Sequence, residues 1–216
     1  MGWLDGLRGR YHESARHAGT ISKCELMRKC EMIKGVIAVA AIGLIAAPLT
    51  AQERDYSRFT TGPVFADEGP NAEIASTMPI PAEAMFMVAM DVAERTSDGD
   101  APNRTLISAA RLINMHARAG VPVERTKVAV VVHGAAALDL LSEEAYAARF
   151  DGAANPNAAI IEALTSQGVR VILCGQSGAA QGIDETRDLA PGVEVALSAM
   201  TAHALLQQSG YTLNPF

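Results

Sequence analysis

The C-terminal part of the chain alternates short apolar runs with segments of helical periodicity, and this alternation constrains the fold more than any other feature. The run at residues 128–132, Val-Ala-Val-Val-Val, has no polar side chain, as is typical of a strand buried on both faces. Comparable runs occupy residues 85–92, 169–174 and 193–197. Because strands alternate with helices, residues 85–216 are predicted to form an α/β domain with three α/β/α layers, a mainly parallel sheet and right-handed crossovers.

Helices are expected between and after these strands. In the first of them, apolar residues recur at helical spacing from Leu106 to Ala117. Asn155 is the expected N-cap of another helix, with Pro156 at its first helical position and Gly168 at its end. The remaining helices are predicted at residues 138–150, 179–189 and 201–209.

Residues 35–52 form an uncharged stretch rich in Val, Ile, Leu and Ala. Its strongly apolar part is too short to span a bilayer comfortably, and the lysine before it and small residues after it predict a secretory signal cleaved near Ala51. A leader that began at the first residue would be long for a signal, so Met27 or Met32 is the expected true start. A retained N-terminal anchor is the alternative.

Cleavage would divide the sequence into a removed leader at residues 1–51, an extended arm at residues 52–84 rich in Gly and Pro, and the α/β domain at residues 85–216. Seven of the 18 basic residues and four of the 24 acidic ones lie in the leader, which leaves 11 against 20 and a net charge of −9. Such a charge argues against nucleic acid or an anionic membrane surface as partner. The mature protein is expected in the periplasm or outside the cell, without a membrane span.

Cys174 is the only cysteine outside the predicted leader, because Cys24 and Cys30 lie within it. The mature chain is therefore expected to hold no internal disulfide. Cys174 closes an apolar strand and directly precedes a glycine-containing turn that opens a helix, where open parallel sheets bind ligands and a helix N-terminus favours thiolate. This position predicts a reactive thiol, and the alternative is that Cys174 is a small buried hydrophobic residue.

His133 follows the apolar run at residues 128–132, and the strand exits of a parallel sheet share one edge. If the two strands are neighbours, His133 would approach Cys174 and favour its thiolate, as in pairs of nucleophile and base. The alternative is that His133 binds a loop carbonyl. The candidate ligand-binding residues at the two strand exits are Gly134, Gly175, Gln176 and Ser177.

The sequence predicts neither a metal site nor a cofactor. No histidine stands in metal-ligand spacing with Cys174, and neither phosphate-binding motif, GxGxxG or GxxxxGK[ST], occurs. The methionines near residues 85–90 are expected to fill the core and not to bind copper.

Four motifs in this order resemble the DsrE/DsrF-like superfamily, and especially an exported, poorly characterised branch of it. They are VAVVVHG at residues 128–134, NPN at 155–157, VILCGQS at 171–177 and VALSAM at 195–200. The resemblance covers roughly residues 85–216 and depends on the ordered set more than on any one motif.

The resemblance implies a domain that assembles into homotrimers or homohexamers. In the sulfur-relay members a cysteine at the strand-to-helix turn accepts sulfur as a persulfide, and the matching residue here is Cys174. Those members carry basic residues where this sequence has Ala179, Ala180 and Gln181. The expected function is thus an exported sulfur-handling protein whose partners are a sulfur donor and an acceptor protein. Two alternatives are an oligomeric scaffold or small-ligand-binding protein with an inert cysteine, and a cysteine hydrolase that uses Cys174 and His133.

Overall fold

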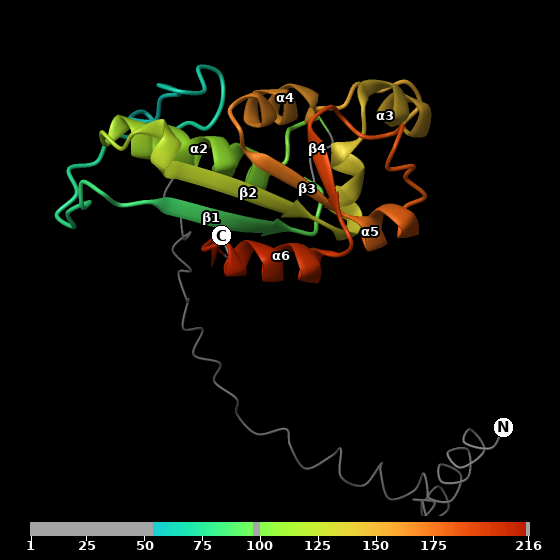
Figure 1. Ribbon diagram of the computed structural model, residues 1–216. Coiled ribbons are helices and arrows are strands. Elements are labelled where there is room, and N and C mark those ends of the chain that lie inside the picture. Colours follow the sequence, from blue (N-terminus) through green and yellow to red (C-terminus); the bar gives the residue numbers. More distant parts are fainter. Residues whose placement is uncertain (1–53, 97–99, 215–216) are drawn as a thin grey trace, which may run out of the picture. The chain divides into compact units, whose positions relative to one another are not determined.

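The computed structural model describes residues 54–96 and 100–214, so the predicted leader and its cleavage site lie outside the described residues. All strands run parallel in one five-stranded sheet of order β4-β3-β2-β1-β5, with helices on both faces (Figure 1). The predicted three-layer α/β/α architecture is therefore confirmed. The strands are β1 (Phe86–Val92), β2 (Thr126–Val132), β3 (Arg170–Cys174), β4 (Val193–Ala196) and β5 (Thr212–Asn214).

The helices follow the strands in the alternating order that the sequence indicates. They are α2 (Arg104–Arg118), α3 (Glu143–Arg149), α4 (Ala158–Ser166), α5 (Gly175–Ala180) and α6 (Ala199–Gln208), with 3-10 helices η1 (Val123–Arg125) and η2 (Gly134–Leu140). Across residues 54–96 and 100–214, no helix has both the length and the apolar character that a bilayer span requires.

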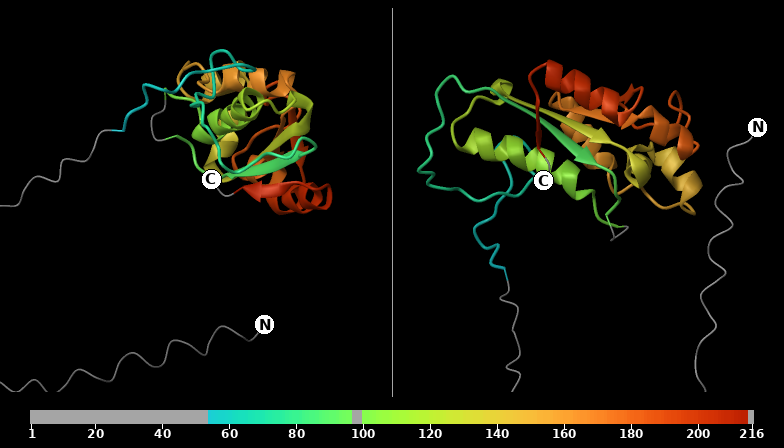
Figure 2. Two further views of the ribbon diagram at one scale, coloured as in Figure 1. Left: turned by 90° about the vertical axis from the view of Figure 1, so that its left-hand side faces the viewer. Right: turned by 90° about the horizontal axis from the view of Figure 1, so that it is seen from below.

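The main hydrophobic core lies between the sheet and the layer of α2 and α4 (Figures 1 and 2). Alternate residues of β2 point into it, and the buried faces of α2 and α4 complete it because their apolar residues recur at helical spacing. Its fully buried large side chains include Leu106, Val130, Ile160, Leu164 and Leu173.

Among the described elements, α6 covers the opposite face of the sheet (Figure 2). Its apolar contacts are few and small, because only Ala202 and Leu206 of the helix belong to the buried cluster there. They pack on Ala89, Val131 and Ile172 from three neighbouring strands. Polar contacts therefore have a larger share in holding α6 on the sheet than in holding α2 or α4.

The single helix predicted at residues 138–150 is two elements, η2 and α3. Leu141 has extended backbone angles and forms an isolated antiparallel bridge with Leu189, so the helix is interrupted there. Ser142 then starts α3, since its hydroxyl accepts a hydrogen bond from the amide of Ala145 at 3.2 Å.

Two other predicted helix boundaries are wrong. The helix expected at residues 179–189 lies instead at Gly175–Ala180, and a turn follows in which a carboxylate oxygen of Asp184 accepts from the amide of Thr186 at 3.0 Å. The helix expected from Asn155 begins at Ala158, because the side chain of Asn155 accepts from the amide of Asn157 at 2.9 Å and forms a turn first.

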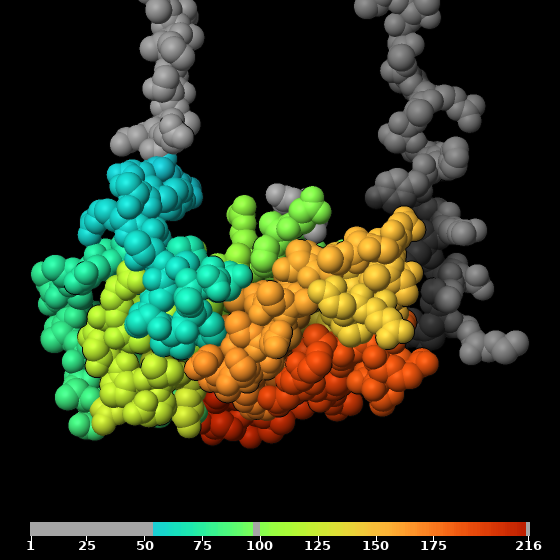
Figure 3. All heavy atoms as spheres, turned by 90° about the horizontal axis from the view of Figure 1, so that it is seen from above, coloured from blue at the N-terminus to red at the C-terminus, as the bar shows by residue number. Residues whose placement is uncertain are grey.

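The segment before β1 packs on α2 through Asn114, which is buried. The amides of Val64 and Phe65 donate to its Oδ1 at 2.9 and 2.8 Å, and its Nδ2 donates to the carbonyl of Glu68 at 2.9 Å. Figure 3 shows this segment, in cyan and teal, over part of the α2 face. The residues that the sequence predicts as an arm thus contact their own domain.

Candidate functional site

Cys174 is the last residue of β3 and the N-cap of α5, at the carboxyl edge of the sheet. Its apolar run places it on β3, and the register of β3 with β4 carries it next to Ala196. The residue is 5% exposed, so the thiol is buried while it faces the start of a helix. Only a small reagent can reach it without movement of the surrounding loops.

Hydrogen-bond donors surround the sulfur of Cys174. They are the hydroxyl of Ser177 and the backbone amides of Ser177, Ala199 and Gln176. Burial alone would raise the pKa of the Cys174 thiol, but these hydrogen bonds outweigh it and hold the pKa below its ordinary value. The amides come from the first turns of both α5 and α6, whose dipoles also favour negative charge. This position favours thiolate.

Gly175 allows the two helices to meet at the thiol. A Cβ at this residue would lie 2.9 Å from the carbonyl oxygen of Ala196, so a larger residue would push β4 away from the turn. Next to it, Nε2 of Gln176 donates to the carbonyl of Leu197 at 3.3 Å. These contacts tie the β4–α6 loop to α5, and Ser198 caps α6 by accepting from the amide of Thr201 at 3.1 Å.

Ser177 and Gly134 link the thiol to the exit of β2. The amide of Gly134 donates to the hydroxyl oxygen of Ser177 at 2.9 Å, which leaves the hydroxyl proton for the sulfur of Cys174. Gly134 has a φ of +57°, and a Cβ there would lie 2.7 Å from the carbonyl oxygen of Ala93. A glycine at this position is therefore what lets the loop after His133 reach Ser177.

His133 lies beside the thiol without binding it. The strands β2 and β3 are neighbours, as the prediction required, and their register would place His133 opposite Cys174. Both side chains share the α6 face, because Val131 and Ile172, two residues before each, pack in the cluster under α6. In the described part of the chain, however, the ring of His133 binds Asp91 and not Cys174.

Asp91 and His203 complete this side of the site, and sequence reasoning missed both. Asp91 Oδ2 lies 3.0 Å from Nε2 of His133, and its Oδ1 lies 2.7 Å from Nε2 of His203. One signal was available, because Asp91 is the only charged residue in the apolar run at residues 85–92. His203 carried no such signal, since it stands in an ordinary helical segment.

The five candidate ligand-binding and catalytic neighbours thus converge on one edge of the sheet. Gly134, Gly175, Gln176 and Ser177 all contact the loops around Cys174, and His133 adjoins them. Within residues 54–96 and 100–214, no group of three or more His, Cys, Asp or Glu residues has an arrangement that could hold a metal ion.

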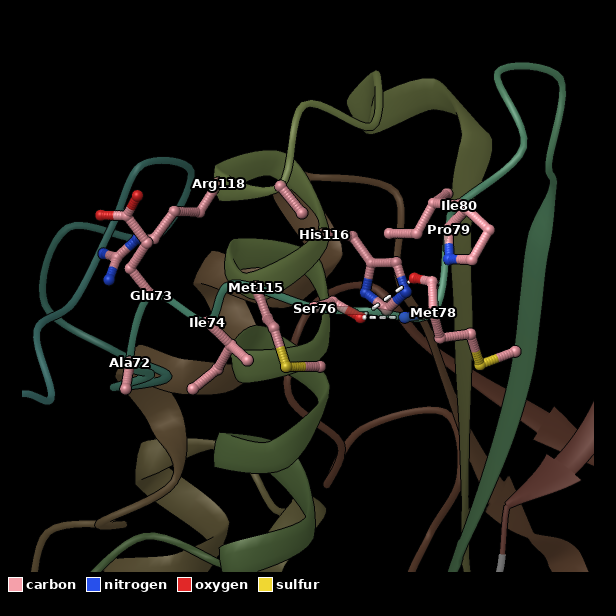
Figure 4. A pocket seen from close by; sticks show the side chains of 11 residues that line it. Ala72, Glu73, Ile74, Ser76, Met78, Pro79, Ile80, Met115, His116 and Arg118 are labelled. Atoms are coloured by element: carbon pink, nitrogen blue, oxygen red, sulfur yellow. Dashed lines mark hydrogen bonds between the residues drawn. The ribbon is translucent and has the colours of Figure 1, made fainter.

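Two of the hollows at the surface of the described residues differ in their position relative to the thiol. Figure 4 shows one of about 610 Å³ between the segment before β1 and α2, lined by Ile74, Met78, Met115 and His116 among others. The ring centroids of His116 and Phe86 are 4.3 Å apart, and Phe86 is the first residue of β1. This hollow therefore lies at the amino-terminal edge of the sheet, whereas Cys174 lies at the carboxyl edge.

The second hollow, of about 350 Å³, lies between β4 and α6 and is lined by Ile172, Leu197, Thr201 and Leu205 among others. It lies on the same face of the sheet as the thiol. It is therefore the better placed of the two for a molecule that approaches Cys174.

Comparisons with known proteins agree with the motifs. A model of the DsrE/DsrF-like family matches residues 86–215. The structure is similar to that of a protein of unknown function, MTH1491 from Methanobacterium thermoautotrophicum, with 22% identity, a TM-score of 0.44, and coverage of 61% of this chain and 99% of that one. It is also similar to the ychN protein from E. coli, with 18% identity, a TM-score of 0.43 and coverage of 61% and 100%. No curated protein matches the chain. The family match confirms the predicted resemblance at the level of the family, and the chain belongs to the DsrE/DsrF-like family.

Proposed function

We propose that this protein carries sulfur, with the Cys174 thiolate accepting a sulfane sulfur atom and passing it to a second thiol. The observation that carries the proposal is the set of donors around Sγ, where one hydroxyl and three backbone amides lower the thiol pKa in spite of burial. Membership of a family that includes sulfur-relay proteins supports it. Because Cys174 is buried, only a small or terminal sulfane sulfur can reach it, so the sulfur donor is a molecule such as a polysulfide or a persulfide.

The transfer needs no external oxidant. The Cys174 thiolate attacks the terminal sulfur of a persulfide R–S–SH, a new S–S bond forms on Cys174, and the old S–S bond breaks with its electron pair leaving on R–S⁻. The product is a Cys174 persulfide, and attack by an acceptor thiolate on its outer sulfur regenerates the Cys174 thiolate. The same amides and hydroxyl stabilise the Cys174 thiolate before loading and as leaving group on release.

The hydrogen bonds to the Cys174 thiol favour a carrier over a cysteine hydrolase. A hydrolase needs donors at the position where a substrate oxygen becomes negative, beside the nucleophile. Here the amides of Gln176, Ser177 and Ala199 lower the pKa of the Cys174 thiol itself. They therefore stabilise a charged sulfur.

Sulfur loading is expected on Cys174 alone. Purified protein in which Cys24 and Cys30 are replaced by serine should gain the mass of one sulfur atom on incubation with polysulfide, which intact-protein mass spectrometry measures, and reductant should remove it. Cys174→Ser in the same background should gain none. A protein that retains Cys174 but stays unmodified, or a Cys174→Ser variant that gains as much sulfur, would contradict the proposal.

The scaffold alternative draws its support from the 5% exposure of Cys174. An inert buried thiol would resist iodoacetamide in the native protein and react only after denaturation. A carrier thiol should react with iodoacetamide in the native state and more slowly with a bulky disulfide reagent, because only small molecules fit between the loops. Absence of any native reaction would favour the scaffold.

Export and assembly are part of the proposal. The leader-like stretch at residues 35–52 supports delivery to the periplasm or beyond, and N-terminal sequencing of the mature protein from its host checks this. Assembly into a homotrimer or homohexamer is supported by exposed apolar side chains near the free edge of β4 and along α6. They are Val195, Leu197, Met200 and Leu205.

Introducing a negative charge at two of these exposed apolar positions on α6 is therefore expected to dissociate the oligomer. Met200 is 81% exposed and Leu205 is 57% exposed, so Met200→Glu with Leu205→Glu removes apolar contacts without disturbing the core. Sedimentation should shift from a multiple to the mass of one subunit. The matched control is Met78→Glu, which is 80% exposed in the segment before β1 and should keep the oligomer. A wild-type mass of one subunit would overturn the assembly proposal.

A further inference from the structure

Asp91 joins two histidines that come from different elements. It lies on β1, while His133 follows β2 and His203 belongs to α6, and the two Nε2 atoms lie 3.0 and 2.7 Å from its two carboxylate oxygens. Burial would raise the pKa of Asp91, but the hydrogen bonds from both rings hold it below its ordinary value. Because a carboxylate only accepts, each neutral ring carries its proton on Nε2.

The two rings differ at their second nitrogen. Nδ1 of His203 is buried and has no hydrogen-bond partner among the described residues, so a proton there would be buried without an acceptor. The His133 side chain is 30% exposed, against 15% for His203. With its Nε2 bound to Asp91, Nδ1 is the nitrogen of His133 that is left to accept a proton.

Cys174, His133 and Asp91 lie on the α6 face near the carboxyl ends of three adjacent strands, with Asp91 opposite Val131 and so diagonal to His133. Neighbouring backbones in a sheet are about 4.8 Å apart, and the register continues to place His133 opposite Cys174. The remaining charged residues on this face are Lys127, at the start of β2, and the pair of Arg170 and Glu194, which bind each other at 2.6 Å. None of them stands between the ring and the thiol.

We propose that His133 is the proton acceptor of the Cys174 thiol, and that Asp91, held by His203, is the positioning residue that fixes this ring. The inference rests on the proposed function and deepens it, since it names the base that prepares the nucleophile. The S–H bond breaks with its electron pair left on sulfur, and the proton forms an N–H bond at Nδ1, directly or through one water. The resulting imidazolium is stabilised by the Asp91 carboxylate.

His203 has a second effect on the same thiol. It fixes α6 to β1 through Asp91, and the first residue of α6, Ala199, donates its amide to the sulfur of Cys174. Since only two residues of α6 lie in the buried cluster, the bond from His203 is a major constraint on the position of that amide. The carboxylate thus positions both the ring and one of the thiolate donors.

The test is the pH profile of alkylation by iodoacetamide in the full chain, read at the Cys174 peptide by mass spectrometry because Cys24 and Cys30 also react. His133→Gln keeps a donor for Asp91 but has no basic nitrogen, and the alkylation rate of Cys174 at neutral pH should fall about tenfold in this variant. In Asp91→Asn the alkylation rate of Cys174 should also fall. His203→Gln keeps a donor for Asp91, and its alkylation rate should stay close to that of wild type. The control Asp67→Asn, an exposed carboxylate on the segment before β1, should match wild type. Superimposable profiles for His133→Gln and wild type would overturn the inference.

A measurement without those variants guards against misfolding. The imidazole signals of His133 in wild-type protein, followed by NMR against pH, should titrate differently in Cys174→Ser, because ring and thiol share a proton. Identical titrations would contradict the inference. The proposed function is tested separately. If Cys174 is alkylated with the expected pH profile but never gains sulfur, the proton transfer to His133 stands and the sulfur-carrier function is contradicted.

Discussion

Replacement of Ser177 by alanine is expected to lower the reactivity of Cys174 about 30-fold at neutral pH. The hydroxyl is the strongest of the four hydrogen bonds that lower the thiol pKa, and a hydrogen bond to a charged group contributes about 2 kcal/mol. Its loss raises the pKa of Cys174, and about 2 kcal/mol corresponds to about a 30-fold lower thiolate fraction at a pH below that pKa. Alkylation rates against pH measure the shift. At high pH, where both thiols are ionised, the two proteins should react equally.

Two variants separate this effect from general damage. Ser177→Thr keeps the hydroxyl and should retain most of the reactivity. Ser166→Ala removes a hydroxyl that donates to the carbonyl of Ala163 at the end of α4, before β3 begins, whereas the thiol is at the far end of that strand. This variant should leave the profile unchanged. A Ser177→Ala protein with the wild-type midpoint would show that the amides alone determine the ionisation of Cys174.

The strands were predictable because runs of apolar residues mark buried strands in the sequence. The run at residues 128–132 is apolar at every position, and its neighbours β1, β3 and β4 begin and end within a few residues of the expected ranges. The strand β5 was missed, since its three residues, Thr-Leu-Asn, have no such pattern and form a strand only by pairing with β1. Tertiary contacts decide such short elements.

Helix α5 was misplaced for a similar reason. Its sequence, GQSGAA, contains two glycines, which have low helix propensity, so the helix was expected in the more charged stretch that overlaps its end, residues 179–189. The helix forms where Cys174 caps it and where Gly175 meets β4. At this position close packing and hydrogen bonds outweigh propensity, and it is also the position of the thiol.

Half of the candidate site was accessible from sequence. Cys174 and His133 stand at strand exits, which topology alone brings to one edge. The partnership of Asp91 with His203 was not accessible, because the two residues are 112 positions apart and meet only once α6 has folded back across the sheet. The same holds for Ala199, whose amide reaches Cys174 from a different helix.

A second carboxylate on the carboxyl edge has a structural role. Asp139, in η2, is buried with a side-chain exposure of 4%, and Arg95 donates from Nε to its Oδ1 at 2.8 Å. Nδ2 of Asn103 donates to its other oxygen at 2.9 Å, and Arg95 also binds the hydroxyl of Tyr146 at 2.7 Å. This network ties the loop after β1 to η2, α2 and α3.

Asp139→Ala is therefore expected to lower the free energy of unfolding by about 3 kcal/mol, because it leaves Arg95 and Asn103 without their acceptor in a buried setting. Denaturant unfolding followed by circular dichroism measures the change. Asp139→Asn, which keeps an acceptor but no charge, should lose less. The exposed ion pair of Arg187 and Asp184 provides the comparison, since Arg187→Ala should cost under about 1 kcal/mol. Equal losses for the two sites would mean that the buried network contributes no more than an exposed pair. The loop after β1 would then be held by its other contacts, such as the hydrogen bonds from the amide of Ala136 to the carbonyl of Ala93 and from Nδ2 of Asn103 to the carbonyl of Glu94.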